Sequence, residues 1–308
     1  MTGRWRAGCT AAGVIAAILL LAAGSFAVVT WFHVRSDRER PATVAESVPE
    51  IPTSSPAADV DETAARVPLR VELEVAVVEV AVVPAAPGEP LSIEADYDDT
   101  RYELVERSEG DPETGWTYRL GLRPRGSRTW ALFRVKLGSP PGQLKVRLPR
   151  DTPLSISGMV DRSFAALELG GLELDAADLR VHSGAAAVSF FDPLKRPMER
   201  LTIEGDTSSI KVAGLGNASP RSAVLEQRVG EIDLDFRGGW VRDAEIRVAG
   251  RLAGGTVWLP DNVVIESAGQ TAVREERVAR EERAAPERAL PVLRLDISSK
   301  AGQLLFVE

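Results

Sequence analysis

The sequence has very few of the residues that usually carry metal and nucleophile chemistry. Its 308 residues include one cysteine, Cys9, and two histidines, His33 and His182. A lone cysteine excludes a disulfide within the chain and every zinc site built on cysteine pairs. Cys9 also precedes the apolar stretch, whereas a lipoprotein acylation signal places the apolar stretch before the cysteine. We therefore expect no cysteine chemistry.

Catalytic motifs are also missing. The chain contains no HExxH zinc motif, no phosphate-binding loop and no nucleophile elbow. His182 precedes Ser183, but neighbours on a strand point to opposite faces and cannot form a nucleophile–base pair directly. We expect His182 to be solvated or satisfied on an outer face, and His33 to lie at a membrane edge. The sequence predicts a non-enzymatic protein with no catalytic residues, no cofactor-binding residues, no metal ligands and no cofactor.

Positive charge is scarce outside the N-terminal segment. The net charge is −8, yet residues 1–40 carry +3, so the rest of the chain carries −11. An acidic body repels the phosphate backbone, which excludes nucleic acid as an expected partner.

Carboxylates line one strand-like stretch. Glu231, Asp233 and Asp235 alternate there, and Glu204 and Asp206 lie one repeat earlier. Such oxygens could form a weak Ca²⁺ patch, but the glycine–aspartate nonapeptide of calcium-binding β-rolls is absent. We expect a solvated outer face.

One long hydrophobic run stands at the N-terminus. After a tail of residues 1–6, residues 7–34 contain no Asp, Glu, Lys or Arg. As a helix this run would reach about 42 Å, more than the hydrocarbon core of about 30 Å. It predicts an uncleaved transmembrane anchor; the rival is a secretory signal cleaved near Ser25-Phe26-Ala27. Arginines flank both ends, so charge alone does not set the orientation. We expect a single-pass membrane protein with an extracytoplasmic C-terminal domain.

Residues 35–66 mix proline, serine, threonine, alanine and acids without an apolar period. Such a segment buries too little surface to offset its ordering entropy, which predicts a disordered linker.

Four later stretches repeat one pattern of alternating apolar residues around small ones. They are residues 177–190, 200–212, 223–236 and 245–259. Leu179, Leu201, Val224 and Ile246 follow one another at 22, 23 and 22 residues, and Val188, Ile210, Ile232 and Val257 at 22, 22 and 25. We interpret each copy as two short strands around a small-residue turn. Stacked units can close a core that one cannot, so the sequence predicts an all-β fold, a single-chain β-helix (β-solenoid) with ~22-residue coils.

The solenoid is expected to span 151–308. The strand-like stretches of 67–150 are spaced more loosely and predict either irregular first coils or a separate cap. Residues 271–288 interrupt the pattern with alternating charge, typical of a solvated helical or disordered insert and less of a docking helix. Trp240 and Trp258 stand near the expected corners, and we expect core or corner packing in preference to stacking on sugar rings.

The copies "ADLRVHSGAAAVSF", "RLTIEGDTSSIKV" and "LRLDISSKAGQLLFV" resemble the bacterial toast-rack family of adhesin-like envelope domains. That family is related to the C-terminal domain of LiaF-type proteins, which respond to cell-wall-active antibiotics. The resemblance covers roughly residues 67–308 and implies a β-helical, often membrane-tethered domain without established catalytic residues. The chain departs from the LiaF-type pattern in its single N-terminal span and in the 271–288 insert.

Three functions remain open from the sequence. The first is a non-enzymatic, membrane-anchored cell-envelope protein whose β-helix is an adhesin-like interaction surface for another envelope protein or cell-wall glycan. The second is a regulatory subunit of a membrane envelope-stress sensor. The third, disfavoured by scattered charges, is a polysaccharide-active enzyme.

Overall fold

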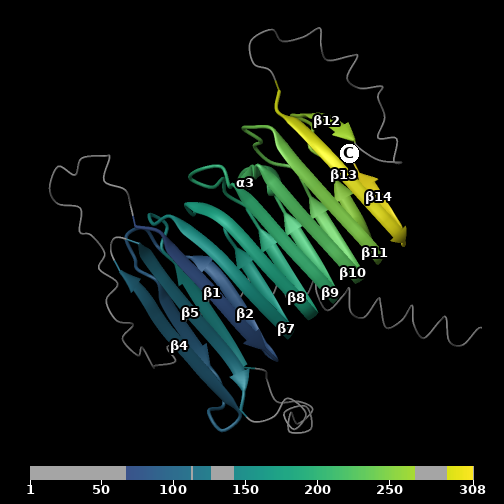
Figure 1. Cartoon of the computed structure of the whole chain (residues 1–308). Coiled ribbons are helices and arrows are strands. Elements are labelled where there is room, and N and C mark those ends of the chain that lie inside the picture. Colours follow the sequence, from purple (N-terminus) through teal and green to yellow (C-terminus); the bar gives the residue numbers. More distant parts are fainter. Residues whose placement is uncertain (1–66, 112–113, 126–141, 268–289, 308) are drawn as a thin grey trace, which may run out of the picture. The chain divides into compact units, whose positions relative to one another are not determined.

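The chain folds into one fourteen-stranded sheet with almost no helix, as a computed structural model shows for residues 67–111, 114–125, 142–267 and 290–307 (Figure 1). All of these residues belong to the compact unit Ala45–Glu308. The strands are β1 (Leu69–Ala76), β2 (Val78–Pro84), β3 (Ser92–Asp96), β4 (Tyr102–Asp111), β5 (Gly115–Pro124), β6 (Gly142–Leu148), β7 (Leu154–Glu168), β8 (Leu174–Ser189), β9 (Arg200–Ala213), β10 (Ser222–Asp235), β11 (Ala244–Trp258), β12 (Val264–Ser267), β13 (Val292–Ala301) and β14 (Leu304–Val307). The one helix among them is α3 (Leu215–Ala218).

The long strands β7 to β11 change the face that they bury near their middle. Residues of odd number such as Leu179 and Val181 are buried early in β8, and residues of even number such as Ala186 and Val188 are buried late. Both halves of a strand therefore turn their apolar side chains to one core. We call the halves before and after this bend the leading and trailing halves.

The bend differs from the predicted turn. Residues 182–187 lie within the continuous strand β8, so each copy is one bent strand and not two strands joined by a turn. Glycine permits the bend because Gly184 and Gly230 have φ values of 106° and 131°, which side chains other than glycine rarely adopt. A Cβ at either position would also lie about 2 Å from a carbonyl oxygen of the preceding strand.

Parallel pairing stacks the copies in the order β7-β8-β9-β10-β11. The predicted period holds on average, but five of the six predicted matches between neighbouring copies were wrong. Ile210 pairs with Ile232 as predicted, whereas Val188 pairs with Val212, Val257 with Leu234 and Ile246 with Ala223. Leu179 pairs with Ile203 and not with Leu201, because the connection after β8 is two residues longer. Val224 pairs with Thr202 and faces outward, so Leu225 occupies the core position instead.

The N-terminal region is both a set of irregular repeats and a cap. β1 pairs with the leading half of β7 and β2 with the trailing half, so together they form one repeat. β5 and β6 form the next repeat outward, although they come later in the chain. Antiparallel β4 and β3 then close the two halves at the edge.

At the other end the chain is again out of order. β13 pairs with the leading half of β11, and β12 lies outside β13 although it precedes it in sequence. β14 pairs with the trailing half of β11. The closing residues thus belong to the sheet, as expected.

The predicted tail, anchor, linker and charged insert (1–6, 7–34, 35–66, 271–288) lie outside the described residues. No helix within the described ranges is long and apolar enough to cross a membrane.

A buried amide sits inside the stack. Gln227 is 1 % exposed; its Nε2 donates to the carbonyl oxygens of Ser208 (2.8 Å) and Val229 (2.6 Å), and its Oε1 accepts from Ser208 Oγ (3.1 Å). Gly205 pairs with Gln227, and a Cβ on it would lie 1.9 Å from Oε1. The amide is satisfied only because the facing residue has no side chain.

This arrangement predicts an asymmetry between two glycines at equivalent positions. Gly205→Ala should lower the free energy of unfolding by about 2 kcal/mol, since the methyl group displaces a hydrogen-bonded buried amide. Gly250 pairs with Gln227 from the other side, but a Cβ there meets nothing closer than 3.3 Å. Gly250→Ala is therefore the matched control and should be nearly neutral in urea denaturation. Equal losses for both variants would contradict the explanation.

Candidate interaction groove

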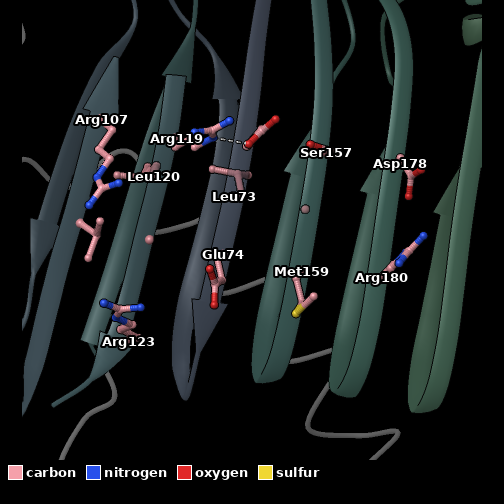
Figure 2. Close-up of a pocket in the computed structure, with 14 residues that line it drawn as sticks. Leu73, Glu74, Arg107, Arg119, Leu120, Arg123, Ser157, Met159, Asp178 and Arg180 are labelled. Carbon is pink, nitrogen blue, oxygen red and sulfur yellow. Dashed lines mark hydrogen bonds and ion pairs between the residues drawn. The ribbon is translucent and has the colours of Figure 1, made fainter. Parts of the chain in front are cut away.

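A hollow of about 560 Å³ lies on the outer face of the leading halves, across β4, β5, β1, β7 and β8 (Figure 2). Its floor is low where the pairing aligns small residues. Gly121 lies between Val105 and Glu74, and Ser157 lies between Glu72 and Asp178. We call this hollow the groove. It is a rigid site because every strand beneath it is bonded into the sheet.

Arginine is concentrated here. Four arginines line the groove, Arg107, Arg119, Arg123 and Arg180, against three carboxylates, on a chain that is acidic overall. Arg107 and Arg119 stand directly opposite each other on the antiparallel pair β4 and β5. Like charges at such positions repel.

Arg119 is compensated by neighbouring carboxylates. Its Nε is 2.7 Å from Glu72 Oε2, and its Nη1 is 3.2 Å from Glu109 Oε2. The hydrogen bond to Glu72, with the charges of Glu109 and Glu72, raises the pKa of Arg119 above its ordinary value. Arg119 thus remains a fixed cation.

Arg107 differs from the other three arginines. Arg123 faces Glu103 at 3.6 Å, and Arg180 faces Glu204 at 3.6 Å. Arg107 is exposed and has no ion pair within the described ranges. The groove therefore presents one guanidinium whose five donors are open to a ligand.

Acceptors and apolar contacts complete the lining. Glu74 and Asp178 have no ion pair with any described residue, and Met159 lies between Glu74 and Arg180 with 40 % of its surface exposed. Figure 2 shows Arg107 and Arg123 on one side of the groove, with Asp178 and Arg180 on the other. Donors, acceptors and a small apolar surface together suit a polar ligand that carries hydroxyl or anionic groups.

His182 lies outside the groove and is exposed, as expected. Its Nδ1 is 2.6 Å from Asp206 Oδ2, and Asp206 Oδ1 is 2.8 Å from Arg228 Nη2. The three side chains come from β8, β9 and β10 in turn. The three side chains form a row along the stack, in which Asp206 contacts both His182 and Arg228.

The predicted acidic face is divided. Glu231, Asp233 and Asp235 are on the trailing half of β10, whereas Glu204 and Asp206 are on the leading half of β9. Asp233 is 3.6 Å from Lys211. Within the described residues, no three His, Cys, Asp or Glu side chains gather as a metal site would require.

The tryptophans occupy different environments. Trp240 is buried at the corner after β10, and its Nε1 donates to the carbonyl oxygen of Phe236 at 2.7 Å. This confirms corner packing for Trp240. Trp258 is half-buried on β11, opposite Asp235 and Val307.

The sequence did not indicate the groove, because it depends on strand order. Val105, Arg107 and Arg123 belong to the irregular region, while Met159 and Arg180 belong to the regular repeat. They meet only because β5 lies beside β1, and β1 beside β7.

Comparisons with known proteins give little guidance. No protein-family model and no curated protein matches the chain. One similar solved structure is the crystal structure of a "putative cell adhesion protein" from Clostridium sporogenes, with 10 % sequence identity and a TM-score of 0.37. The match covers 78 % of this chain and 92 % of that one. A TM-score this low establishes neither a shared fold nor a shared function.

The charge pattern of the groove makes a testable prediction. Arg107→Glu replaces a like-charged pair with an opposite-charged one beside Arg119, so the urea midpoint should rise slightly at low salt. The gain should vanish in about 1 M NaCl, where surface charges are screened. Arg123→Glu is the matched control: it faces Glu103 and should lower the midpoint. If Arg107→Glu lowers it as well, Arg107 makes stabilising contacts that outweigh its repulsion with Arg119.

Proposed function

We propose that this chain is a non-enzymatic, membrane-anchored protein of the cell envelope whose stacked repeat, wound as a β-solenoid, presents the groove to an extracytoplasmic ligand. The single observation that carries the proposal is the groove itself: a rigid hollow on an acidic chain, lined by four arginines of which one has no ion pair. Anchoring rests on the apolar run 7–34 in the sequence, and the adhesin-like role on the resemblance of the repeats.

We take cell-wall glycan as the ligand class. A polyhydroxylated chain can accept hydrogen bonds from Arg107 and donate them to Glu74 and Asp178, and its apolar faces can lie on Met159 and Val105. The two unpaired carboxylates would repel a ligand of purely anionic character, so a mixed polar surface fits the groove best.

Topology is tested first. With an epitope tag at the C-terminus, protease should remove the tag in intact cells, since the proposal puts the sheet outside the membrane. Protection in intact cells and digestion after permeabilisation would place the sheet inside and end the proposal.

Ligand binding is tested by co-sedimentation of the purified chain with isolated native cell walls. Arg107→Ser should reduce the retained fraction about tenfold, because a charge-assisted hydrogen bond is lost. Gly121→Val should do the same without changing charge, by filling the floor. Arg251→Ser is the matched control, since Arg251 is exposed on β11 away from the groove and has no ion pair among the described residues.

Two outcomes would count against the glycan. Equal retention of the unsubstituted chain and its three variants would show that the groove is not the binding site. Retention that survives enzymatic digestion of the glycan strands would point to an envelope protein as the partner instead.

A further inference from the structure

Two arginines on the β4–β5 side of the groove have donors that the protein does not use. Arg107 has no ion pair, and Arg123 is 3.6 Å from Glu103, which is close enough for an ion pair but not for a hydrogen bond. Neither guanidinium donates a hydrogen bond to any residue that the structure describes. Arg119, by contrast, already donates two hydrogen bonds to carboxylates. The donors of Arg107 and Arg123 are therefore open to a ligand.

These two arginines stand on either side of one gap. On the outer face of the antiparallel pair β4 and β5, Arg107 comes one outward pair before Val105 and Gly121, and Arg123 comes one outward pair after them. Each such step is about 7 Å along the strands. A Cβ on Gly121 would lie 3.8 Å from Val105 Cβ and 3.9 Å from Glu74 Cβ, so the gap is one side chain wide. Both guanidiniums lie on this side of the groove and can reach over the gap from opposite ends (Figure 2).

A carboxylate suits this gap better than an uncharged group. The planar fork of a guanidinium matches the two oxygens of a carboxylate, and such charge-assisted hydrogen bonds are roughly twice as strong as neutral ones. A negative charge here also lies beside Arg107 and Arg119, which repel each other across β4 and β5. Binding would therefore weaken a repulsion that the unliganded sheet carries.

The rest of the groove does not suit a second anion. Glu74 on β1 and Asp178 on β8 have no ion pair with any described residue, so each would repel further negative charge while accepting hydrogen bonds from hydroxyl or amide groups. Met159 on β7 offers an apolar contact between them. From β4 to β8 the groove crosses four strand intervals, about 19 Å in all, which is room for more than one sugar. The lining thus changes across the groove from cationic to accepting and apolar.

We propose that the groove binds a cell-wall glycan in which sugars with a free carboxylate alternate with uncharged sugars, and that the carboxylate lies over Gly121 between Arg107 and Arg123. This inference rests on the proposed function and adds to it the charge of the ligand and its direction in the groove. The uncharged sugar then lies toward β1 and β7, over Glu74 and Met159. Because wall peptides are joined to sugar carboxylates as amides, the groove would distinguish strands without peptides from strands that carry them.

Calorimetric titration of the purified full-length chain in detergent compares two forms of one glycan. Wall strands freed of their peptides by an amidase carry a carboxylate on every second sugar, and part of this sample is converted to the neutral methylamide. The unsubstituted chain should bind the acidic strands about tenfold more tightly than the neutral ones, because only the acidic form makes the charge-assisted contact. The difference should shrink in about 1 M NaCl, where exposed charges are screened.

Three substitutions locate the carboxylate. Arg107→Gln and Arg123→Gln should each lower the affinity for acidic strands about tenfold and leave the affinity for neutral strands nearly unchanged, since glutamine keeps an N–H donor but not the charge. Arg180→Gln is the matched control: Arg180 also lines the groove and faces a carboxylate at 3.6 Å, but on the opposite side. It should weaken both forms by the same factor and keep the preference. All three arginines are exposed, so the urea midpoints should change little.

The outcomes separate this inference from the proposed function. Equal affinity of the unsubstituted chain for acidic and neutral strands would overturn the carboxylate assignment and leave glycan binding in place, whereas binding of neither form would defeat both. Loss of the preference in Arg180→Gln and not in Arg107→Gln would overturn the direction assigned to the ligand. Tighter binding of poly(glycerol phosphate) than of the acidic strands would overturn the inference in favour of a phosphate polymer.

Discussion

The structure depends on parallel backbone pairing between repeats that are too thin to hold a core alone. Each strand from β7 to β11 contributes one layer of side chains, and those layers are buried only because a neighbouring repeat lies on each side. Hydrogen bonding between repeats and burial within them are therefore one constraint. Within each strand the bend meets this constraint, because Gly184 and Gly230 let both halves of their strands face the same core. The same stacking allows the core to hold Gln227, because Gly205 on the adjacent strand leaves the space that the amide fills.

Stacking also explains how the outer face comes to carry a groove. Outward residues of successive strands align into rows, so a groove is made by whichever side chains the strand order brings together. Gly121 and Ser157 lower the floor, and arginines from β4 and β5 stand at one side. Because Arg107 lies on β4, which is paired along its length with β5, it is held on a strand, and binding a ligand there would order no loop, which lowers the entropic cost of binding. The antiparallel pairing of β4 with β5 sets Arg107 opposite Arg119. Arg107 is also the one arginine of the groove without an ion pair among the described residues.

The sequence predicted the all-β class and the period near 22, because alternation and small residues recur in one chain region. It matched Leu179 with Leu201 and Val188 with Ile210, each two residues before the true partner, because a spacing count does not detect the two extra residues after β8. It also placed Val224 in the core, whereas Ala223 and Leu225 on either side of it are the buried residues. It could not predict the groove. β5 pairs with β1 across more than forty residues of sequence, and nothing in the alternation of either strand specifies that neighbour. The anchor, the linker and the charged insert stay predictions.

At both ends of the sheet the outermost strands are out of sequence order, and this decides which strands form the edges. At the N-terminal end β5 and β6 are laid outside β1 and β2 and then covered by antiparallel strands with charged side chains, which finishes that end. At the C-terminal end β13 enters between β11 and β12, so the shorter strand is outermost and covers only the leading half. The trailing half ends at β14, whose four residues carry no charge. Among the described residues, the sheet therefore has one charged edge and one edge that ends on an apolar strand, and the groove lies near the charged edge.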